Sequence, residues 1–328
     1  MPTVNLVLWD NGVGLTRDMR ILCDAWTGAG YEVFVSANRR GRLRKWLQPL
    51  RLRTRMCRQK LRGDDARGRF DFNVMLEHIR PQYLALAKCN VFVPNPEWFD
   101  AKDAALLRNV DLVLTKTSHA QSIFESLGRA TRYLGFTSPD RFDPGVRRQG
   151  QFFHLAGRSI HKGTEALLDL WEQHGEWPRL TIVQHPKTAR RRRVAANIDH
   201  RIGYLPDAQL RELENRHLFH LCPSQTEGFG HYIVSALSLG AVTLTVDAPP
   251  MNELVTPQRG LLVPYLRTGT QGLATTFHFD VQAMQARVLA AIQMDGQHAN
   301  AIRGQARAWY LANDAAFRRR AVEALQTI

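Results

Sequence analysis

The sequence predicts an α/β fold of two doubly wound domains that face each other across a cleft. Three observations support this prediction. Strand-like and helix-like stretches alternate from the first residues, the alternation breaks once near the middle, and it then restarts. A chain of 328 residues, of which 44% are hydrophobic, is long enough to bury two cores. Repeated alternation of strands and helices is typical of parallel sheets covered by helices.

The first half predicts a Rossmann-like domain over residues 1–140. Alternating apolar residues indicate a strand at 4–9, which a tight loop at 11–14 follows. A helix is expected at 16–27, with Thr16 as its candidate cap. Further strands of this domain are predicted at 31–36, 72–76, 90–93 and 110–115.

The second half predicts a nucleotide-binding domain over residues 150–300. Residues 136–150 are rich in Thr, Ser, Pro, Asp and Gly and poor in apolar side chains, so we interpret them as a linker. Residues 301–328 predict a helix. The strands of the second domain are expected at 152–155, 180–184, 218–222 and 242–246, and its helices at 163–173, 208–215 and 233–239.

A glycine between a strand and two basic residues predicts an anion site. Gly157 follows the strand at 152–155, and Arg158 and Lys162 precede the helix that begins at Gly163. Glycine lets a ligand approach the backbone, and the first turn of a helix offers N–H groups. With the two cations this arrangement suits a diphosphate, although two charged residues alone more often mark a solvated loop.

A glycine-rich turn follows the strand predicted at 218–222. Between that strand and the helix at 233–239 lie Glu227 and the run Gly228-Phe229-Gly230. Glycine amides at a helix N-terminus donate to phosphate or sugar oxygens, and a carboxylate accepts from sugar hydroxyls. The alternative is a simple strand–helix turn with a glutamate at the surface. Against it, the distance in sequence between this turn and the loop at Arg158 is typical of loops that follow two neighbouring strands.

These motifs belong to an ordered series of six in the second half of the chain. The series is Gly157, Arg158, Lys162 and Gly163; Gly203-Tyr204-Leu205-Pro206; Pro223, Ser224 and Glu227 to Gly230; Gly240-Ala241-Val242; Glu253-Leu254-Val255; and Gly260 to Pro264. Residues 153–264 thereby resemble the donor domain of retaining glycosyltransferases of the GT-B fold, a large family that includes bacterial mannosyl- and glucosyltransferases. Each motif alone is weak, but six in order are specific.

The resemblance implies a nucleotide-sugar co-substrate, linked through UDP or GDP. Its diphosphate would lie near Arg158, Lys162 and the helix after Gly230, its base beside 203–206, and its sugar hydroxyls near Glu227. The reaction implied is transfer to a hydroxyl acceptor with retention, in which the departing phosphate helps to remove the acceptor proton. The chain has no Asp-x-Asp metal motif, so we expect neither a metal nor a further cofactor. The resemblance also implies that the helix at 301–328 packs back toward the first domain.

One position departs from the family's pattern. The family carries a second glutamate eight residues after the first, where it binds the donor ribose, and here that position is Ser235. A single hydroxyl cannot make the two contacts of a carboxylate. We therefore expect ribose recognition to be weaker, or to be supplied by other groups.

The first half of the chain matches the family more loosely. Gly12 and Gly14 lie where these enzymes place a glycine loop that faces the donor phosphates and the acceptor. The stretch that ends at His78 resembles the strand whose terminal histidine lies near the acceptor, and a packed or surface histidine is an equal alternative. Further acidic candidates at predicted strand ends are Glu77, Glu97 and Asp10.

A basic segment at 36–62 predicts an anionic partner. It holds eleven of the 44 Lys and Arg residues and no acid, and so carries most of the net charge of +14. Its apolar residues recur at steps of three and four around Pro49, which favours an interrupted amphipathic helix. The residues that we expect to contact the partner are Arg39, Arg40, Arg42, Arg44, Lys45, Arg51, Arg53 and Arg55, with Arg190 and Arg191 of a second basic run.

Three interpretations of the basic segment stay open. A membrane surface ranks first, because anionic lipids attract basic amphipathic helices and many members of the family act on lipid-linked acceptors. Nucleic acid follows closely, because arginines grip phosphates and some phage enzymes of this fold glycosylate modified DNA bases that are flipped out of the duplex. In the third interpretation the arginines are solvated and the apolar stripe packs on the core.

Two other functional classes also stay open. A sugar-nucleotide epimerase shares the donor fold, and it would need acid and base groups on both sides of the sugar and no acceptor. A non-catalytic nucleic-acid-binding protein with a vestigial donor site is the other, and Ser235 gives it some weight.

We expect the protein in the cytoplasm, where it could still touch the inner face of a membrane. The start of the chain lacks the features of a signal peptide, and no apolar run approaches the roughly 20 residues that span a bilayer. The four cysteines lie far apart, which argues against a zinc site or a disulfide framework.

Overall fold

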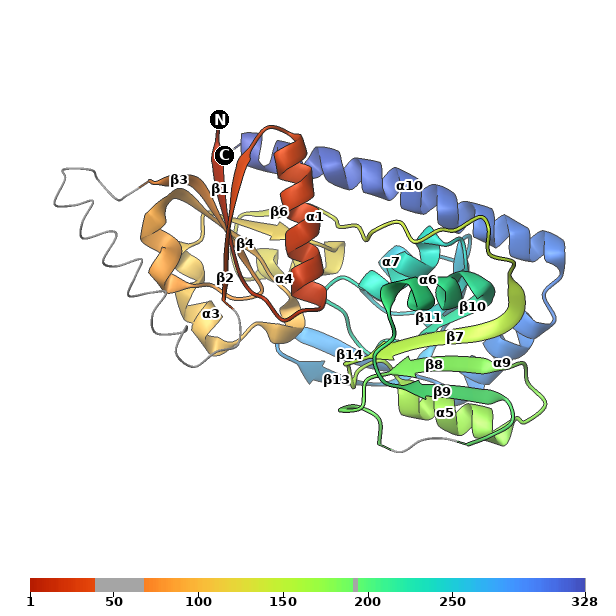
Figure 1. Ribbon diagram of the computed structural model, residues 1–328. Coiled ribbons are helices and arrows are strands. Elements are labelled where there is room, and N and C mark those ends of the chain that lie inside the picture. The colour runs from red at the N-terminus through yellow and green to blue at the C-terminus, as the bar shows by residue number, and fades with distance from the viewer. Residues whose placement is uncertain (39–67, 191–193, 328) are drawn as a thin grey trace. The chain divides into compact units, whose positions relative to one another are not determined.

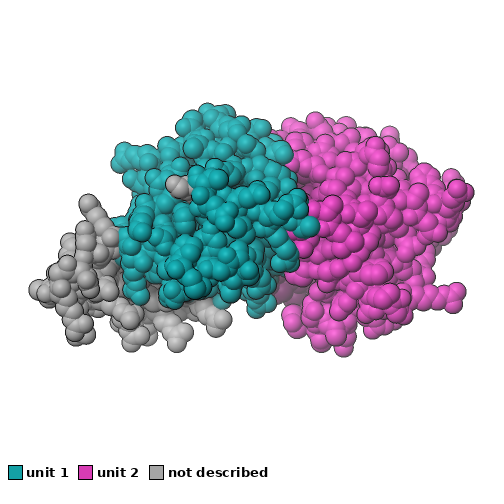
Figure 2. Space-filling model, turned by 90° about the horizontal axis from the view of Figure 1, so that it is seen from above, with its two compact units in different colours: residues 1–136, 315–328 teal, residues 137–314 magenta. Residues whose placement is uncertain are grey.

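The computed structural model describes residues 1–38, 68–190 and 194–327, which form two compact units (Figures 1 and 2). Unit 1 comprises Met1–Phe136 and Ala315–Ile328, and unit 2 comprises Thr137–Asp314. Each unit contains a parallel sheet of six strands with interleaved helices, which confirms the predicted α/β class with two doubly wound sheets. The basic stretch at 39–67, with its expected amphipathic helix, and Arg191 lie outside the described residues.

The sheet of unit 1 has the strand order β2-β1-β3-β4-β5-β6. Its strands are β1 (Thr3–Trp9), β2 (Glu32–Asn38), β3 (Phe70–Leu76), β4 (Ala87–Val93), β5 (Leu112–Thr115) and β6 (Thr131–Tyr133). The helices are α1 (Gly14–Gly28), α3 (Ala101–Leu106) and α4 (Ser118–Ser126), with short 3-10 turns η1 (Pro81–Leu86), η2 (Pro96–Trp98) and η3 (Leu107–Asn109). The central strands are buried on both faces, as the continuous apolar run Val74-Met75-Leu76 requires of a covered parallel sheet.

The predicted capping role of Thr16 is wrong. Helix α1 begins at Gly14, and its N-cap is Val13, which makes no side-chain capping bond. The Thr16 hydroxyl instead donates to Asp10 Oδ1 at 2.5 Å and accepts from the Gly12 amide at 2.9 Å. Thr16 therefore links the loop at Gly12 to Asp10, which directly follows β1, because its hydroxyl bonds both residues.

The sheet of unit 2 has the order β12-β11-β10-β7-β8-β9. Its strands are β7 (Gln149–Gly157), β8 (Leu180–Gln184), β9 (Ile198–Ile202), β10 (His217–Cys222), β11 (Val242–Val246) and β12 (Gly260–Val263). Its helices are α5 (Thr164–Gln173), α6 (Asp207–Arg216), α7 (His231–Ser238), α8 (Met251–Leu254) and α9 (Val281–Ile292). An antiparallel hairpin of β13 (Tyr265–Gln271) and β14 (Ala274–Phe279), which the sequence did not predict, forms a separate small sheet.

The segment predicted as a linker contains neither a helix nor a strand between residues 137 and 148. Its residues belong to unit 2, where Arg141 forms ion pairs with Glu214 and Asp207 of α6. The Asn215 amide also donates to the Arg141 carbonyl at 2.9 Å. Residue Arg141 of this stretch is thus held against α6 by two ion pairs and a hydrogen bond.

The last helix, α10, runs from Gly296 to Gln326 and begins five residues before the predicted helix at 301–328. Its first part belongs to unit 2, and the part from Ala315 belongs to unit 1. In unit 1 the Trp26 indole N–H donates to the Ala321 carbonyl at 2.8 Å, and Phe317 packs on Phe136 with ring centroids 5.0 Å apart. None of the helices in the described ranges combines the length and apolar character needed to cross a bilayer.

Candidate functional site

The two glycine-rich loops of unit 2 lie against each other. Strands β7 and β10 are parallel neighbours, so the loops that follow them leave the same edge of the sheet. A Cβ atom on Gly163 would lie only 2.8 Å from the Pro223 carbonyl oxygen, so the loops touch at that point. The Gln225 amide donates to the His161 carbonyl at 2.8 Å, and the two side chains meet at 3.2 Å. The predicted proximity of the two motifs is therefore observed.

Glycines in the left-handed region shape both loops. Gly157, Gly163 and Gly230 have φ of 56°, 66° and 101°, values that other residues adopt only with strain. Gly163 is the N-cap of α5 and Gly230 is the N-cap of α7, and neither helix has a side-chain capping bond. Two helix N-termini therefore begin beside the two loops, and N–H groups in such positions suit an anion.

Lys162 and Glu227 form an ion pair between these loops. Their side chains are only 14% and 15% exposed, so water screens the pair less than it would at an open surface. The Ser224 hydroxyl also contacts Glu227 Oε1, and it lies 2.5 Å from the Tyr232 hydroxyl. The Lys162 ammonium is 3.3 Å from the centroid of the Tyr232 ring, a cation–π contact.

Sequence reasoning missed Tyr232 as a member of this group. A tyrosine in the first turn of an apolar helix is indistinguishable from a core residue by its spacing alone. Burial raises the pKa of the Tyr232 hydroxyl well above its usual value, so the group stays protonated. Tyr232 therefore offers Lys162 an aromatic face and Ser224 a neutral hydroxyl.

The other predicted donor residues occupy different surroundings. Arg158 is exposed directly after Gly157. Tyr204 is 87% exposed, and it lines a pocket of about 290 Å³ that residues 199–205, including Leu205, form at the end of β9. Ser235 is 4% exposed within α7, which has no acid in its first turn.

The unpredicted hairpin borders the same loops. The Phe277 amide donates to the Gln225 carbonyl at 2.6 Å, and a Cβ on Gly163 would lie 3.1 Å from the Phe279 ring. Strand β13 is exposed over nearly its whole length, so an alternating pattern of buried residues could not mark it in the sequence. The hairpin thus contacts both loops, through Gln225 and beside Gly163.

In unit 1 a buried polar network lies at the carboxyl ends of the strands. Lys116, which follows β5, bonds Asp18 of α1 at 2.5 Å and Asn95 at 2.9 Å. Asn95 donates in turn to Glu77 at 3.3 Å. Glu77 has φ of 68°, which is strained for a residue with a side chain, and burial raises its pKa.

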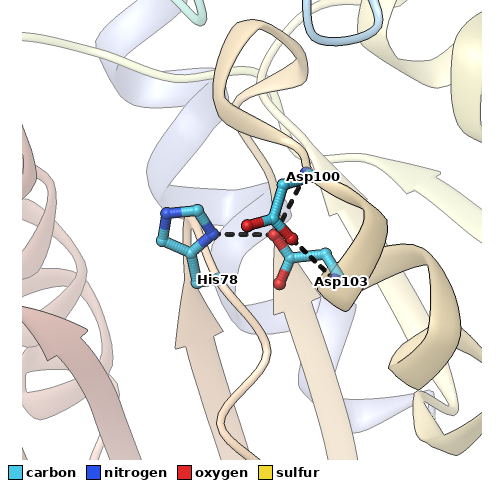
Figure 3. A group of neighbouring side chains, drawn as sticks. All are labelled: His78, Asp100 and Asp103. Carbon is cyan, nitrogen blue, oxygen red and sulfur yellow. Dashed lines mark hydrogen bonds and ion pairs between the residues drawn. The ribbon is translucent and has the colours of Figure 1, made fainter.

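His78 follows Glu77 and pairs with Asp103 of α3 (Figure 3). The distance from His78 Nδ1 to Asp103 Oδ2 is 2.7 Å. The hydrogen bond to Asp103 raises the pKa of His78 above its usual range. The predicted loop glycines lie elsewhere in unit 1, after β1, where Gly12 has φ of 73° and Gly14 begins α1.

His78, Asp100 and Asp103 have ligand atoms within 4.8 Å of one another, close enough to surround an ion. Hydrogen bonds already engage these carboxylates. Asp100 accepts from the amides of Lys102 and Asp103, and Asp103 accepts from the Ile79 amide at 2.8 Å. The two aspartates form the capping box of α3, which accounts for their proximity.

Several solved structures share this architecture. Sucrose-phosphate synthase from Thermosynechococcus elongatus aligns with a TM-score of 0.72 at 13% identity, over 100% of this chain and 98% of that one. A glycosyltransferase from Rickettsia africae gives 0.72 at 12% identity, over 99% and 98%. The pneumococcal O-GlcNAc transferase, solved with UDP and GlcNAc, gives 0.58 at 14% identity over 78% of this chain, which spans 56% of that protein.

No protein-family model and no curated protein matches the sequence. The similarity therefore rests on structure, and at 12–14% identity it establishes the fold. The chain has the two-domain GT-B fold of these glycosyltransferases.

Proposed function

We propose that this chain is a glycosyltransferase that moves a sugar from a UDP- or GDP-linked donor to a hydroxyl acceptor with retention. The observation that carries the proposal is the contact of the loops 157–163 and 223–230 at Gly163 and Pro223. This contact brings Lys162, Glu227 and two helix N-termini together at one edge of the sheet, and the exposed Arg158 belongs to the first of the two loops. Such a combination suits a diphosphate that carries a sugar.

In this proposal, the residues where the loops leave the sheet of unit 2 stabilise the negative charge that develops on the departing diphosphate. Arg158, Lys162 and the N-terminus of α7 supply fixed positive charge and dipoles, so they would act without a metal ion. The Lys162 ammonium has three N–H donors, and its bond to Glu227 leaves it able to donate to a phosphate oxygen. Glu227 would hold the sugar hydroxyls.

The pocket at 199–205 would receive the base of the donor. Tyr204 offers an exposed ring for stacking, and Leu205 adds apolar surface. Ser235 can contribute only one hydroxyl to the ribose, so we propose that the base and the diphosphate carry most of the donor affinity.

For the acceptor we propose a hydroxyl presented on an anionic surface, first a lipid-linked glycan. The basic segment 36–62 motivates this proposal, as does the exposed Arg190 of unit 2. DNA with a modified base is the second candidate, because the same charges would grip phosphates. Co-sedimentation with anionic liposomes and gel shifts with duplex DNA, both at several salt concentrations, separate them. Salt-sensitive binding to DNA but not to liposomes would overturn the membrane proposal.

The experiment that tests the enzyme class measures nucleoside diphosphate release from a panel of UDP- and GDP-sugars. We expect release from one donor and at least a hundredfold slower turnover in Glu227→Ala, a loss of the size seen when one stabilising group leaves a polar active site. Glu125→Ala, an exposed glutamate in unit 1, is the control and keeps the rate. Equal rates in Glu227→Ala would overturn the site. Interconversion of the donor without release would indicate an epimerase.

A further inference from the structure

Tyr232 lies at the second position of α7, next to the loops at 157–163 and 223–230. Helix α7 begins at His231, directly after its left-handed N-cap Gly230. Side chains of an α-helix tilt toward its N-terminus, so a residue of the first turn can contact the loop that precedes the helix. The next two residues, Ile233 and Val234, are apolar and fully buried, whereas Tyr232 is 8% exposed and carries a polar group. Tyr232 is therefore placed to contact loop residues as well as to pack.

The ring of Tyr232 contacts Lys162 of the first loop. The ammonium nitrogen lies 3.3 Å from the ring centroid, and the same ammonium forms the ion pair with Glu227. A lysine has a long flexible stem, so its charge needs such contacts to stay in one place. An aromatic face attracts a cation without neutralising it, unlike a second carboxylate. The ring therefore restrains the ammonium and leaves its positive charge available to a phosphate.

The hydroxyl of Tyr232 reaches Glu227 through Ser224 of the second loop. Ser224 has one hydroxyl proton, which it donates to Glu227 Oε1. The Ser224 oxygen lies 2.5 Å from the Tyr232 hydroxyl, so Tyr232 must be the donor in that bond. Burial raises the pKa of Tyr232 well above its usual value, so the proton stays on the hydroxyl. Hydrogen bonds that point the same way polarise one another, and this chain points toward the carboxylate.

The contacts of Glu227 reach only one of its two carboxylate oxygens. Oε1 accepts from both Lys162 and Ser224. Within the part of the chain that the structure describes, no hydrogen bond reaches Oε2. A carboxylate has about four acceptor positions, so Oε2 can accept from a ligand while Oε1 keeps its two partners.

We propose that Tyr232 is a positioning residue of the site for the sugar diphosphate. Its ring holds Lys162 toward the diphosphate, and its hydroxyl, through Ser224, holds Glu227 toward the sugar. The inference rests on the proposed function and deepens it, because it assigns two roles to two parts of one side chain. The ring governs the affinity for the nucleotide, whereas the hydroxyl governs the turnover of a donor that carries a sugar.

Two variants of Tyr232 separate the ring from the hydroxyl, because phenylalanine keeps the ring and leucine removes both. We expect Tyr232→Phe to bind UDP or GDP as tightly as the wild type, since these nucleotides carry no sugar for Glu227 to hold. Its kcat for nucleoside diphosphate release, with the donor that the panel identifies, should fall about 10-fold, as is typical when a hydrogen bond to a charged group is lost. Tyr232→Leu should also bind the nucleotide about 10-fold more weakly.

A double-mutant cycle tests whether the ring acts through Lys162. Isothermal titration compares Lys162→Ala with Lys162→Ala/Tyr232→Leu, using the nucleotide that the wild type binds. Once the ammonium is absent, removal of the ring should change the affinity by less than about twofold, since the two residues act as a pair. A ring that only packs α7 would cause the same loss of affinity with and without Lys162.

Tyr310→Phe is the matched control for the loss of a buried hydroxyl. Tyr310 is 3% exposed and belongs to unit 2, and its hydroxyl donates to the Ser138 carbonyl at 2.8 Å. Its removal should lower the thermal midpoint but leave the nucleotide affinity and kcat at their wild-type values. Thermal unfolding shows that each variant is folded, and Tyr232→Met replaces Tyr232→Leu if the leucine variant is not.

The outcomes separate this inference from the proposed function. A wild type that binds neither nucleotide and releases nucleoside diphosphate from no donor overturns both. The inference alone is overturned, and the proposed function stands, if an active wild type and Tyr232→Phe have the same kcat. The same holds if Tyr232→Leu binds the nucleotide as tightly as the wild type, or loses equal affinity with and without Lys162.

Discussion

At the scale of single residues, the contact between the loops at 157–163 and 223–230 depends on Gly163, which the sequence marks as a motif glycine at the start of a helix. Gly163 has φ of 66°, and a Cβ there would lie 2.8 Å from the Pro223 carbonyl. Both the backbone conformation and the space exclude a side chain. The sequence could predict that the two loops are near each other, but not that they touch at this atom, because the contact depends on how β7 and β10 pair.

We predict that Gly163→Ala destabilises unit 2 by about 1–3 kcal/mol, because alanine must either strain the backbone or push the loops apart. The measurement is the urea midpoint of unfolding, together with the affinity for UDP and GDP. Gly175→Ala is the matched control, since nothing lies within 4 Å of a Cβ at that position. Equal midpoints for the two variants would show that the loops do not need this contact.

The residues of the candidate site could be predicted more readily than their pairing. The glycine spacing and the ordered motifs indicated Lys162 and Glu227, yet the ion pair between them joins positions 65 residues apart. Such a contact depends on strand order and on rotamers, which no local pattern encodes. The same holds for His78 and Asp103, which come from a strand end and a helix cap.

At the scale of elements, the strands that the sequence predicted are those with continuous apolar runs. The sequence did not predict strand β9, because its five residues, Ile-Asp-His-Arg-Ile, are not a continuous apolar run. They include Asp199 and Arg201, which form an ion pair at 2.8 Å. The sequence did not predict the hairpin, because nearly all residues of β13 are exposed. Periodicity detects burial, so elements that lie at the surface or at a sheet edge give little signal.

Buried histidines in the strands of unit 2 make its stability depend on pH. Burial lowers the pKa of His154 on β7 to about 4 and that of His220 on β10 to about 3. In the unfolded chain each takes up a proton below about 6.5, whereas the folded protein resists this. The stabilisation is therefore complete above 6.5 and falls as the pH drops toward 4.

We predict a lower urea midpoint at pH 5.0 than at pH 7.5, with a loss of about 1.4 kcal/mol per pH unit for each of the two histidines below 6.5. Carboxylates with ordinary pKa values stay ionised over most of the range from pH 7.5 to pH 5.0, so they add little to this change in stability. His298→Ala, which removes an exposed histidine, should keep the same dependence. A midpoint that does not change between the two pH values would contradict the assignment of neutral buried rings.

At the scale of the whole molecule, the chain order of the two units is not a simple succession. The sequence predicted two consecutive domains and a final helix at 301–328, and the resemblance implied that this helix packs back toward the first domain. The structure assigns Ala315–Ile328 to unit 1, so the first unit is completed only by the last residues of the chain. Phe317 and Ala321 are fully buried there, against Phe136 and beneath the Trp26 indole. No local signal shows which unit a terminal helix joins.

We predict that Phe317→Ala destabilises unit 1 by about 3–5 kcal/mol, as is typical when a buried aromatic ring is removed. Leu311→Ala is the control on the same helix, because Leu311 is 50% exposed and should lose little. Thermal unfolding and limited proteolysis of the full chain would measure the difference. If both variants unfold alike, the end of α10 does not complete the core of unit 1.

The central claim is that the loops at 157–163 and 223–230 of unit 2 bind the diphosphate of a nucleotide sugar. Isothermal titration of the wild type and of Arg158→Ala/Lys162→Ala with UDP and GDP tests it most directly. We predict that the wild type binds one of the two nucleotides and that the double variant binds it at least about 100-fold more weakly, since each lost charged hydrogen bond costs about 1.5–3 kcal/mol. Equal affinity in the two proteins, or no binding of either nucleotide to the wild type, would contradict the claim.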